Sequence, residues 1–503
     1  MVTSNVSPVI GINKDNCVNC HACITACPVK DCNDGSGDTV SLNHDLCIGC
    51  GACLSACTHD ARSILDDTDD FISALNRGEQ MVAIVAPAAA ANFPHQYLQL
   101  NGWLKSKGVE AIFDVSFGAE LTVKSYLEHI KANNPPTVIA QPCPAIVNYI
   151  EMYKPELLEH LAPADSPMLH TVKMIKEFYP QYSSHDVVVI SSCIAKKREF
   201  EETGCGDYNV TFTNLDKYFQ DHGVNLSQFE KVDFDNPPAE RAVLFSTPGG
   251  LMRTADREVP GITEKTRKIE GQEMIYPYLD KLPSMIKQGK APLLIDCLNC
   301  PMGCNGGTGT NCKDKSPDEI ESLIEERNQE MKSRYEKKAL LSKSKDKKQP
   351  DSKKLAAAIE SKWKPGLYGR SYVDRSSSRN IVEPTESQKQ DIFRSMGKTT
   401  QRDMLNCGSC GYGSCEKMAV AIHNGLNKKE NCMQYREDQV TKEKELAQSA
   451  TDQTTKLANV VSSTIGQSNK SVVEKATHLL EVADNQKKEF DNLIVEIGQI
   501  RTV

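Results

Sequence analysis

Clustered cysteines constrain this chain more than any other feature of its sequence. Twenty of its 503 residues are cysteine, and most stand in short-spaced groups. A reducing cell interior disfavours disulfides, so such groups indicate metal sites. Two runs share the spacing C-x2-C-x2-C-x3-C, namely Cys17, Cys20, Cys23, Cys27 and Cys47, Cys50, Cys53, Cys57.

Each of these two runs is suited to hold a cubane iron–sulfur cluster, because two-residue gaps let three thiolates converge from one tight loop. In two-cluster ferredoxins the fourth cysteine of each run ligates the other cluster. Zinc is the alternative, although zinc motifs rarely place four cysteines at this spacing. Cys32 falls outside both runs and is interpreted as a plain thiol. The expected ligand sets are Cys17, Cys20, Cys23, Cys57 for one 4Fe-4S cluster and Cys47, Cys50, Cys53, Cys27 for the other.

A third group of cysteines near the C-terminus has the spacing C-x2-C-x4-C-x16-C. Its members are Cys407, Cys410, Cys415 and Cys432. Glycines interrupt the loop that carries the first three, and glycine lets a backbone fold close to a cluster. The group resembles the small iron–sulfur module of several anaerobic electron-transfer and corrinoid proteins. We expect a third 4Fe-4S cluster here, and zinc stays open as an alternative.

The bulk composition is typical of a cytoplasmic protein with several domains. A length of 503 residues exceeds one hydrophobic core, and the net charge of -8 gives no global basic field for nucleic acid. We see no secretory leader, and the most apolar segment, Met81–Phe93, is interrupted by Pro87 and too short to span a bilayer. The basic stretch Lys343–Lys354 is better explained as a solvated linker than as a binding patch.

The middle of the chain is predicted to be an α/β domain with parallel sheets. Its short runs of Val, Ile and Leu show little alternation, which is typical of strands buried on both faces. Amphipathic stretches such as Glu120–Asn133 and Met168–Phe178 lie between the runs and give a repeated β–α order. The expected strands are Met81–Ala86, Ala111–Val115, Thr137–Ala140, Val187–Ser191, Ala242–Phe245 and Leu293–Ile295.

Five segments follow from these patterns. In the last of them, apolar residues such as Leu457, Val461 and Ile465 recur at helical spacing, but the heptad register drifts. A coiled coil that forms a homodimer and a helix packed on the protein's own body are both open. The segments are a two-cluster ferredoxin-like α+β domain (8–65), the α/β domain (78–312), a charged helix and linker (313–395), a 4Fe-4S module (396–435) and a long helical or coiled-coil tail (436–503).

The cysteines of the α/β domain each follow an expected strand. Cys143 and Cys193 follow Thr137–Ala140 and Val187–Ser191, and the group Cys297, Cys300, Cys304 follows Leu293–Ile295. Ligands in open α/β sheets gather outside the carboxyl ends of strands, so these positions are expected to share one crevice. Taken singly, each is better explained as an inert buried thiol. Jointly they favour a further cubane-type cluster, whose chemistry the spacing does not specify.

This α/β segment resembles the catalytic domain of FeFe-hydrogenases. Three signatures stand in the family's order: Gln141-Pro142-Cys143-Pro144, Cys193-Ile194-Ala195-Lys196-Lys197 with Glu199, and Cys300-Pro301-Met302-Gly303-Cys304-Asn305-Gly306-Gly307. With the N-terminal unit, the resemblance covers about the first 312 residues.

The resemblance implies a specific cofactor, the H-cluster. Cys143, Cys193, Cys300 and Cys304 would hold its 4Fe-4S cubane, and Cys304 would bridge to a two-iron subcluster with CO, CN and azadithiolate. Lys196 would donate to a cyanide ligand, so Lys196 and Cys304 are the expected catalytic residues. Cys297 has no counterpart among the family ligands and is expected either to lie just behind the ligands or to be structural.

The chain departs from the family where protons are expected to move. Catalytic members usually have a second cysteine before the first ligand, and this position is Pro142, which has no transferable proton. Fast turnover needs a relay with matched pKa values and hydrogen-bond reach. The departure implies slow turnover or another proton route. Glu120, Tyr126 and His129 are candidates for that route, although ordinary roles on a helix surface explain each of them better.

Slow turnover and the additional domains resemble the divergent branch of the family to which hydrogen sensing is ascribed. We therefore expect a hydrogen sensor that slowly interconverts H2 with protons and electrons. Its partner would be a redox protein such as ferredoxin or a signalling protein, with no nucleic acid and no membrane span. Two alternatives stay open: a ferredoxin-linked hydrogenase with an altered proton path, and an electron-transfer or scaffold protein that lacks the two-iron subcluster.

Overall fold

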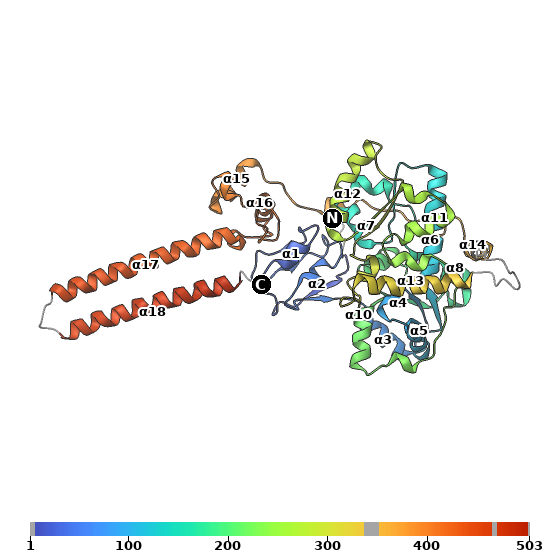
Figure 1. Cartoon of the computed structure of the whole chain (residues 1–503), viewed down its shortest axis with the longest axis horizontal. Helices are drawn as coiled ribbons and strands as arrows, with labels where there is room; N and C mark the ends of the chain where they lie inside the picture. Colours follow the sequence, from blue (N-terminus) through green and yellow to red (C-terminus); the bar gives the residue numbers. More distant parts are fainter. Residues whose placement is uncertain (1–5, 336–351, 465–469, 501–503) are drawn as a thin grey trace. The chain divides into compact units, whose positions relative to one another are not determined.

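The computed structural model describes residues 6–335, 352–464 and 470–500 (Figure 1). The chain divides into two compact units, residues 1–381 and 382–503. Most of the basic stretch that the sequence predicts as a linker, and the end of the chain at Val503, lie outside the described residues.

The first unit begins with a small α+β layer that carries both N-terminal cysteine runs. Its strands β1 (Ile10–Ile12) and β4 (Arg62–Ile64) pair antiparallel, as do β2 (Asn33–Asp34) and β3 (Ser41–Leu42). Each cysteine run leads into a five-residue helix, α1 (Ala22–Ala26) or α2 (Ala52–Ala56). The residue before each helix, His21 or Gly51, is left-handed. The ferredoxin-like architecture predicted from the sequence is confirmed.

Two parallel sheets form the α/β part of this unit. The larger has the strand order β6-β5-β8-β9 and the smaller has the order β10-β11-β7. Every neighbouring pair in both sheets is parallel, as predicted. The strands are β5 (Met81–Val85), β6 (Ala111–Asp114), β7 (Val138–Ile139), β8 (Asp186–Ser191), β9 (Tyr208–Thr211), β10 (Thr266–Glu270) and β11 (Leu294–Leu298).

One strand prediction is wrong and two strands escape prediction. Residues 242–246 form the 3-10 helix η4 (Ala242–Ser246), which is buried throughout. A short run of buried apolar residues suits a strand and a buried helical turn equally well, so periodicity does not separate them. The missed strands are β9 and β10, and β10 carries the partly exposed sequence TRKIE, which has no apolar run.

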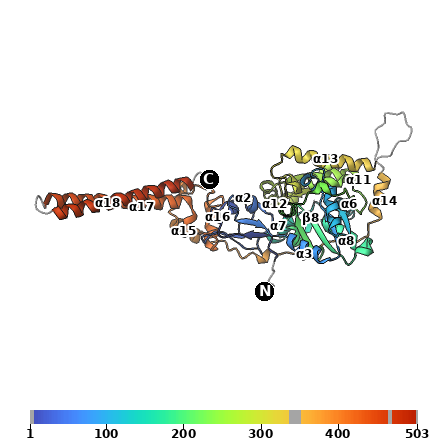
Figure 2. The ribbon, with the colours of Figure 1, turned by 90° about the horizontal axis from the view of Figure 1, so that it is seen from below.

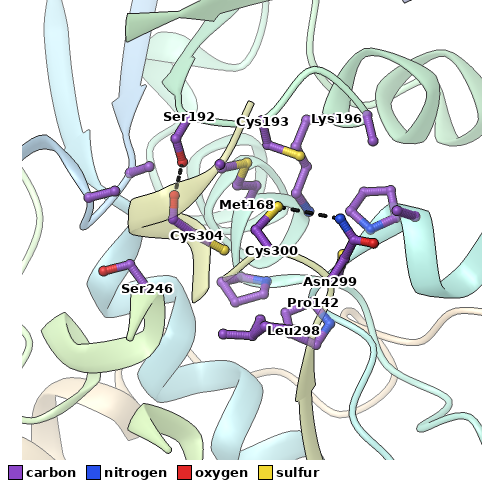
Figure 3. A pocket seen from close by; sticks show the side chains of 18 of the residues that line it. Pro142, Met168, Ser192, Cys193, Lys196, Ser246, Leu298, Asn299, Cys300 and Cys304 are labelled. Atoms are coloured by element: carbon purple, nitrogen blue, oxygen red, sulfur yellow. Dashed lines mark hydrogen bonds between the residues drawn. The ribbon is translucent and has the colours of Figure 1, made fainter. Parts of the chain in front are cut away.

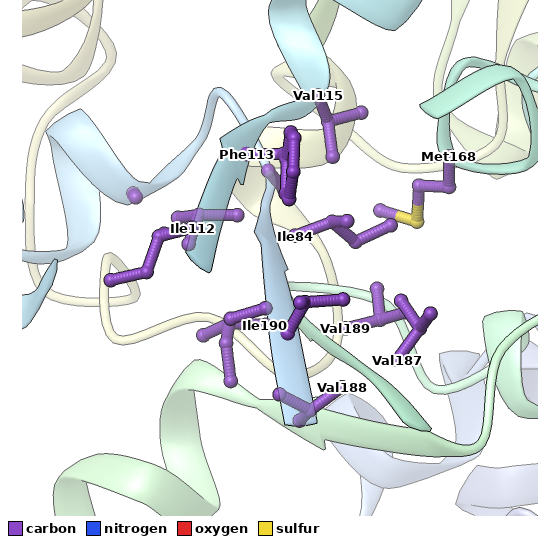
Figure 4. Packing of buried hydrophobic residues seen from close by; sticks show 14 of the residues in the cluster. Ile84, Ile112, Phe113, Val115, Met168, Val187, Val188, Val189 and Ile190 are labelled. Carbon is purple, nitrogen blue, oxygen red and sulfur yellow. The ribbon is translucent and has the colours of Figure 1, made fainter. Parts of the chain in front are cut away.

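The larger sheet is buried on both faces, and its side chains make the main core (Figure 4). Ile84 on β5, Phe113 on β6 and Val189 on β8 are fully buried. Met168, from a covering helix, packs against the same cluster. Because helices cover both faces, apolar residues need not alternate along these strands, which explains the continuous apolar runs.

Helices cover the two sheets, and α6 and α8 lie side by side (Figure 2). Helix α8 begins where Ser166 Oγ accepts a hydrogen bond from the Leu169 N–H, with Pro167 in the first turn. The helices of this part are α3 (Thr68–Arg77), α4 (Ala89–Asn92), α5 (Tyr97–Ser106), α6 (Val115–Asn133), α7 (Pro144–Tyr153), α8 (Pro167–Phe178), α9 (Lys196–Thr203), α10 (Phe212–Asp221), α11 (Gly250–Glu258), α12 (Gln272–Lys287), α13 (Pro317–Arg334) and α14 (Ser352–Glu360).

The last part of the first unit, residues 361–381, is a mostly irregular segment that we call the strap. The Tyr368 ring stacks on the buried His170 ring of α8, with centroids 4.5 Å apart. Arg375 forms an ion pair with Glu151 of α7 at 2.7 Å. The strap is therefore fixed to the α/β part by ring and charge contacts.

The second unit is helical and holds the C-terminal cysteine group. Its helices are α15 (Glu386–Ser395), α16 (Cys415–His423), α17 (Met433–Thr464) and α18 (Lys470–Ile500). The predicted long C-terminal helix is present, but it is divided into α17 and α18, which lie side by side and run in opposite directions (Figure 1). None of the described helices is long and apolar enough to cross a membrane.

Candidate active site

Four cysteines from separate parts of the α/β region meet at one cavity (Figure 3). Cys143 stands directly before α7, Cys193 follows β8, and Cys300 and Cys304 follow β11. All four line a cavity of about 70 Å³. Cys297 does not line it; its thiol lies within β11, 3.4 Å from the Ala140 carbonyl. The structure thus brings together the four predicted ligands and leaves the fifth cysteine aside.

The cavity lies where strands of both sheets end. Parallel strands point their carboxyl ends in one direction, so the loops after β7, β8 and β11 gather there. Close backbone packing holds them together: Ser192 Oγ donates to the Cys304 carbonyl at 2.6 Å. A Cβ atom at Gly307 would lie 2.4 Å from the Ser192 carbonyl oxygen, so only glycine fits at this position.

The cavity wall is mainly apolar, and this affects the thiols. Burial raises the pKa of Cys193 to about 11 and that of Cys304 to about 12, and the charge of Cys143 adds to both shifts. Bare thiolates are therefore disfavoured, and a cationic group must compensate them. Four thiols in a mainly apolar pocket are the donor set that suits iron–sulfur chemistry, so these residues fit a cluster.

Lys196 is the one lysine in the cavity wall, and it belongs to a buried charge network. Its Nζ donates to Ser166 Oγ at 2.9 Å and forms an ion pair with Glu199. The other carboxylate oxygen of Glu199 accepts from Arg370 of the strap at 2.7 Å. Burial alone would raise the pKa of Glu199, but the neighbouring cations Lys196 and Arg370 outweigh it and lower that pKa.

Pro142 lines the same cavity, and none of the three proton-route candidates does. Glu120 is buried in an ion pair with Arg257 at 2.6 Å. The Tyr126 hydroxyl accepts a hydrogen bond from the Gln141 backbone N–H at 3.3 Å, and burial raises the pKa of Tyr126. His129 contacts Asn133 on the outer side of α6. These contacts are ordinary structural roles, but the predicted position on a helix surface is wrong for Glu120 and Tyr126, which are both buried.

Comparison with known families shows what this region is similar to. Residues 79–308 match the family model described as "Iron only hydrogenase large subunit, C-terminal domain". Residues 79–308 are thus similar to the C-terminal domain of the iron-only hydrogenase large subunit. Residues 9–58 match the model "4Fe-4S dicluster domain", and residues 403–434 match "Putative Fe-S cluster". After the models that they match, we call residues 79–308 the hydrogenase domain and residues 9–58 the dicluster unit.

Curated relatives of the chain are divergent. Iron hydrogenase 1 of Clostridium pasteurianum is 28% identical over 221 residues, which are 38% of this chain and 38% of that protein. The periplasmic Fe hydrogenase large subunit of Nitratidesulfovibrio vulgaris is 24% identical over 254 residues, 41% of this chain and 60% of that protein. The matches thus span less than two thirds of these two relatives. Protein NAR1 of Arabidopsis thaliana is 22% identical over 318 residues, 48% of this chain and 67% of that protein.

A solved structure of similar shape is a variant of the FeFe-hydrogenase HydA1 from Chlamydomonas reinhardtii. It is 18% identical, the TM-score is 0.47, and the match covers 62% of this chain and 99% of that chain.

The second cysteine run of the dicluster unit packs against the hydrogenase domain. Cys50 lines the same cavity as the four cysteines of the domain. Carbonyls of the loop accept from the domain's side chains, for example Leu46 from the Tyr153 hydroxyl at 2.8 Å. A Cβ atom at Gly51 would lie 2.0 Å from Thr308 Cγ2, so the absence of a side chain there permits the close approach.

The two expected ligand sets of the dicluster unit differ in exposure. Every member of the set Cys47, Cys50, Cys53, Cys27 is buried. In the set Cys17, Cys20, Cys23, Cys57 only Cys23 is buried, and Cys20 is exposed. Cys32, which the sequence placed outside both sets, lies with its Sγ 3.7 Å from Cys27 Sγ.

Asn299 connects the cavity of the hydrogenase domain to the second cysteine run of the dicluster unit. Its amide donates to Cys300 Sγ at 3.4 Å and to the Cys50 carbonyl at 3.5 Å. Its carbonyl oxygen accepts from the buried Tyr276 hydroxyl at 2.5 Å. Sequence reasoning missed Asn299 and Tyr276 because their roles depend on the docked unit. The only available signal was the position of Asn299 beside Cys300.

The four C-terminal cysteines also line one cavity, within the second unit. Cys415 begins α16, whose N-terminus is capped by Ser414 Oγ. The Cys415 backbone N–H donates to Asn406 Oδ1 at 2.8 Å, which fixes the loop before the helix. The other members of the group are Cys407, Cys410 and Cys432.

Proposed function

We propose that the hydrogenase domain holds an H-cluster and that the protein binds H2 and slowly interconverts it with protons and electrons, as a hydrogen sensor. The single observation that carries this proposal is the cavity where four cysteine thiols and the buried Lys196 meet. A cubane alone needs four thiolates but no lysine, whereas an anionic cyanide ligand gives Lys196 a partner.

The residues of the cavity have distinct roles in this proposal. Cys143, Cys193, Cys300 and Cys304 would hold the cubane, and Cys304 would also be a ligand of the two-iron subcluster. When bound, the subcluster supplies the site where H2 is split or formed. Lys196 donates to a cyanide ligand, since two of its three N–H donors have partners, Ser166 and Glu199, and the third is left for the cavity. The mainly apolar wall offers water few hydrogen-bond partners.

One residue of the cavity wall supports slow turnover. Pro142 stands where catalytic members usually have a proton-carrying cysteine, and it lines the cavity. Proline offers neither an N–H nor a titratable group, so it transfers no proton. A protein that binds H2 but exchanges protons slowly is suited to report hydrogen instead of consuming it.

Two alternatives differ from sensing in measurable ways. A working ferredoxin-linked hydrogenase would use another proton path and would show high specific activity. An electron-transfer or scaffold protein would hold cubanes without the two-iron subcluster. The match to protein NAR1, whose name is not that of a hydrogenase, keeps this second alternative in view.

The dicluster unit supports electron exchange with a partner such as ferredoxin or a signalling protein. Its second run borders the cavity and its first run includes the exposed Cys20, so we place partner docking at the first run. One 4Fe-4S cluster on each set, and a third on the C-terminal cysteines, complete the proposed cofactors.

For the C-terminal site we favour a cluster over zinc. Four thiols line its cavity, and residues 403–434 match the model "Putative Fe-S cluster".

The C-terminal helices support a homodimer as the signalling form. Large apolar side chains on both helices are exposed, including Leu446 and Leu457 on α17 and Leu479 and Leu493 on α18. A second copy of this helix pair would cover them. We further propose a cytoplasmic location, because its reducing conditions would keep the sixteen proposed ligand cysteines free to bind iron.

Infrared spectroscopy tests the proposal directly. The full chain is purified without oxygen, loaded with a synthetic two-iron subcluster, and measured with and without H2. We expect CO and CN bands that shift under H2, together with low turnover. High turnover would favour a working hydrogenase. Absent bands at a full cubane iron content would overturn both hydrogenase functions.

Two cysteine variants provide a matched pair for the same measurement. Cys300→Ser removes a proposed ligand and should abolish the bands. Cys297→Ser alters a buried cysteine three residues earlier that does not line the cavity, and the bands should persist.

A further inference from the structure

Arg370 takes part in the buried charge network of Lys196 and Glu199, although it lies outside the hydrogenase domain. It belongs to the strap, whereas the family match ends at residue 308. Its side chain is only 5% exposed, and its guanidinium donates to Glu199 Oε1 at 2.7 Å. A second N–H group contacts Glu202 at 3.5 Å, near the surface. The family match therefore assigns no role to this residue.

The position of the guanidinium is fixed by its neighbours in the strap. The Arg370 backbone N–H donates to the Pro163 carbonyl at 3.4 Å. Its guanidinium lies 5.4 Å from the centre of the Tyr372 ring. The Tyr372 hydroxyl in turn donates to the Ala162 carbonyl at 2.8 Å. Arg370 is thus held against Glu199 by contacts on both sides.

The charges in this network decide what Lys196 can offer to the cavity. Lys196 and Glu199 alone would form a neutral pair, with the carboxylate drawing the ammonium away from the cavity. Arg370 takes one oxygen of Glu199, while Lys196 and the Ser166 hydroxyl share the other. A carboxylate shared by two cations attracts each of them less. The three charged groups together carry a net positive charge at the cavity.

We propose that Arg370 is a positioning residue that balances Glu199 so that the Lys196 ammonium stays directed at an anionic ligand in the cavity. This inference rests on the proposed function, in which that ligand is a cyanide of the two-iron subcluster. Arg370 itself does not line the cavity, so it acts through Glu199. The strap therefore completes the charge balance of the active site.

A purely structural role for Arg370 makes a different prediction. Arg375 anchors the same strap by an ion pair with Glu151, and neither residue lines the cavity. If Arg370 only fastens the strap, Arg370→Gln and Arg375→Gln should affect the cavity alike. If it positions Lys196, only the first change should alter a ligand there.

Cyanide stretching bands are the readout that separates these roles. The full-length wild type, Arg370→Gln, Arg370→Lys and Arg375→Gln are loaded with the synthetic two-iron subcluster and measured without H2. In Arg370→Gln the freed carboxylate draws Lys196 back, so a CN band should move to lower frequency. Arg370→Lys keeps the charge and should restore the band at least in part, and Arg375→Gln should leave it in place.

A surface variant covers the case in which Arg370→Gln does not fold. Glu202→Gln removes the competing outer partner of Arg370, whose contact is the longer of the two. Arg370 should then bind Glu199 more strongly, and the same CN band should move to higher frequency.

The possible outcomes are distinct. The inference would be overturned if the CN band of Arg370→Gln stayed in place or moved to higher frequency. It would also be overturned if Arg370→Lys did not restore the band, or if Arg375→Gln shifted it equally. Each of these results would leave the proposed function standing. A wild-type chain that shows no CO and CN bands would overturn the proposed function and the inference with it.

Discussion

The two halves of the dicluster unit have the same cysteine spacing and opposite surroundings. The run from Cys47 packs against the hydrogenase domain, and its expected ligand set is fully buried. The set that begins with Cys17 includes the exposed Cys20. The spacing therefore predicts which atoms bind iron, and the neighbouring domain determines how exposed each predicted ligand set is. A buried cluster beside the cavity suits exchange with the active site, and an exposed one suits exchange with a partner.

The largest expected effect comes from removing one ligand of each set. Cys50→Ser should abolish the response of the hydrogenase-domain infrared bands to reduced ferredoxin, because it removes the cluster beside the cavity. Cys20→Ser should slow that response but leave the reaction of the bands with H2 intact. Infrared spectra and iron content measure both.

Cys32→Ser is the matched control for these two variants. It changes a buried cysteine beside Cys27 that belongs to neither set, so both clusters should remain. Equal effects of Cys50→Ser and Cys20→Ser would show that the difference in surroundings has no functional meaning.

The second prediction concerns the contact that buries the second run. Arg198 is buried and donates to the carbonyls of Ser7 and Cys47, so Arg198→Gln should lower the free energy of unfolding by about 3 kcal/mol. Its neighbour Lys197 forms a more exposed ion pair with Asp67, and Lys197→Gln should cost below about 1 kcal/mol. Chemical denaturation followed by circular dichroism compares them. A similar cost for both would mean that this contact does not fasten the dicluster unit.

The third prediction uses pH. Burial lowers the pKa of His170 to about 3, against about 6.5 in the unfolded chain. Between these values the unfolded state binds a proton that the native state does not, so stability falls as pH falls. The loss should reach roughly 2 kcal/mol at pH 5 and vanish above pH 7.

His170→Gln should remove this acid sensitivity, and denaturation at several pH values measures it. If the hydrogenase domain protects the second run, its cluster should be lost at the same acid pH at which the domain unfolds, and the variant should move both. The coupling would be contradicted if the His170→Gln variant lost both clusters of the dicluster unit at the same pH as the wild type.

The smallest expected effect is at Asn299. An N–H donor to a cluster sulfur favours the more negative, reduced state, so Asn299→Ala should lower the reduction potential of the cubane at Cys300. The cluster on the exposed set should keep its potential. A redox titration followed by electron paramagnetic resonance distinguishes the two, and an equal shift in both would argue against a local effect.

The sequence predicts the parts of this molecule that depend on local patterns. Cysteine spacing is local, and the strands that precede Cys143, Cys193 and Cys300 are continuous apolar runs, so their convergence follows from the rule for parallel strand ends. Residues 242–246 show the limit of this reasoning. A buried helical turn and a buried strand have the same apolar composition at that length.

Contacts between distant segments are not predictable in this way. Arg370 meets Glu199 across 171 residues, from an irregular segment with no periodicity to reveal it. The asymmetry of the two cysteine runs is also hidden, because it arises from docking against another domain. The ligand roles, the third cluster and the sensory function stay predictions.

Gly51 has a consequence for symmetry. A unit with two nearly equivalent halves has two orientations related by a half-turn, and cysteine spacing alone would make them nearly equal in energy. The equivalent of Gly51 in the other half is His21, and both precede a short helix in a left-handed conformation. Since any Cβ at this position would overlap Thr308, only the half with glycine can face the hydrogenase domain. A single missing side chain thus gives the two halves a fixed polarity: the run with Cys50 borders the cavity, and the run with the exposed Cys20 does not.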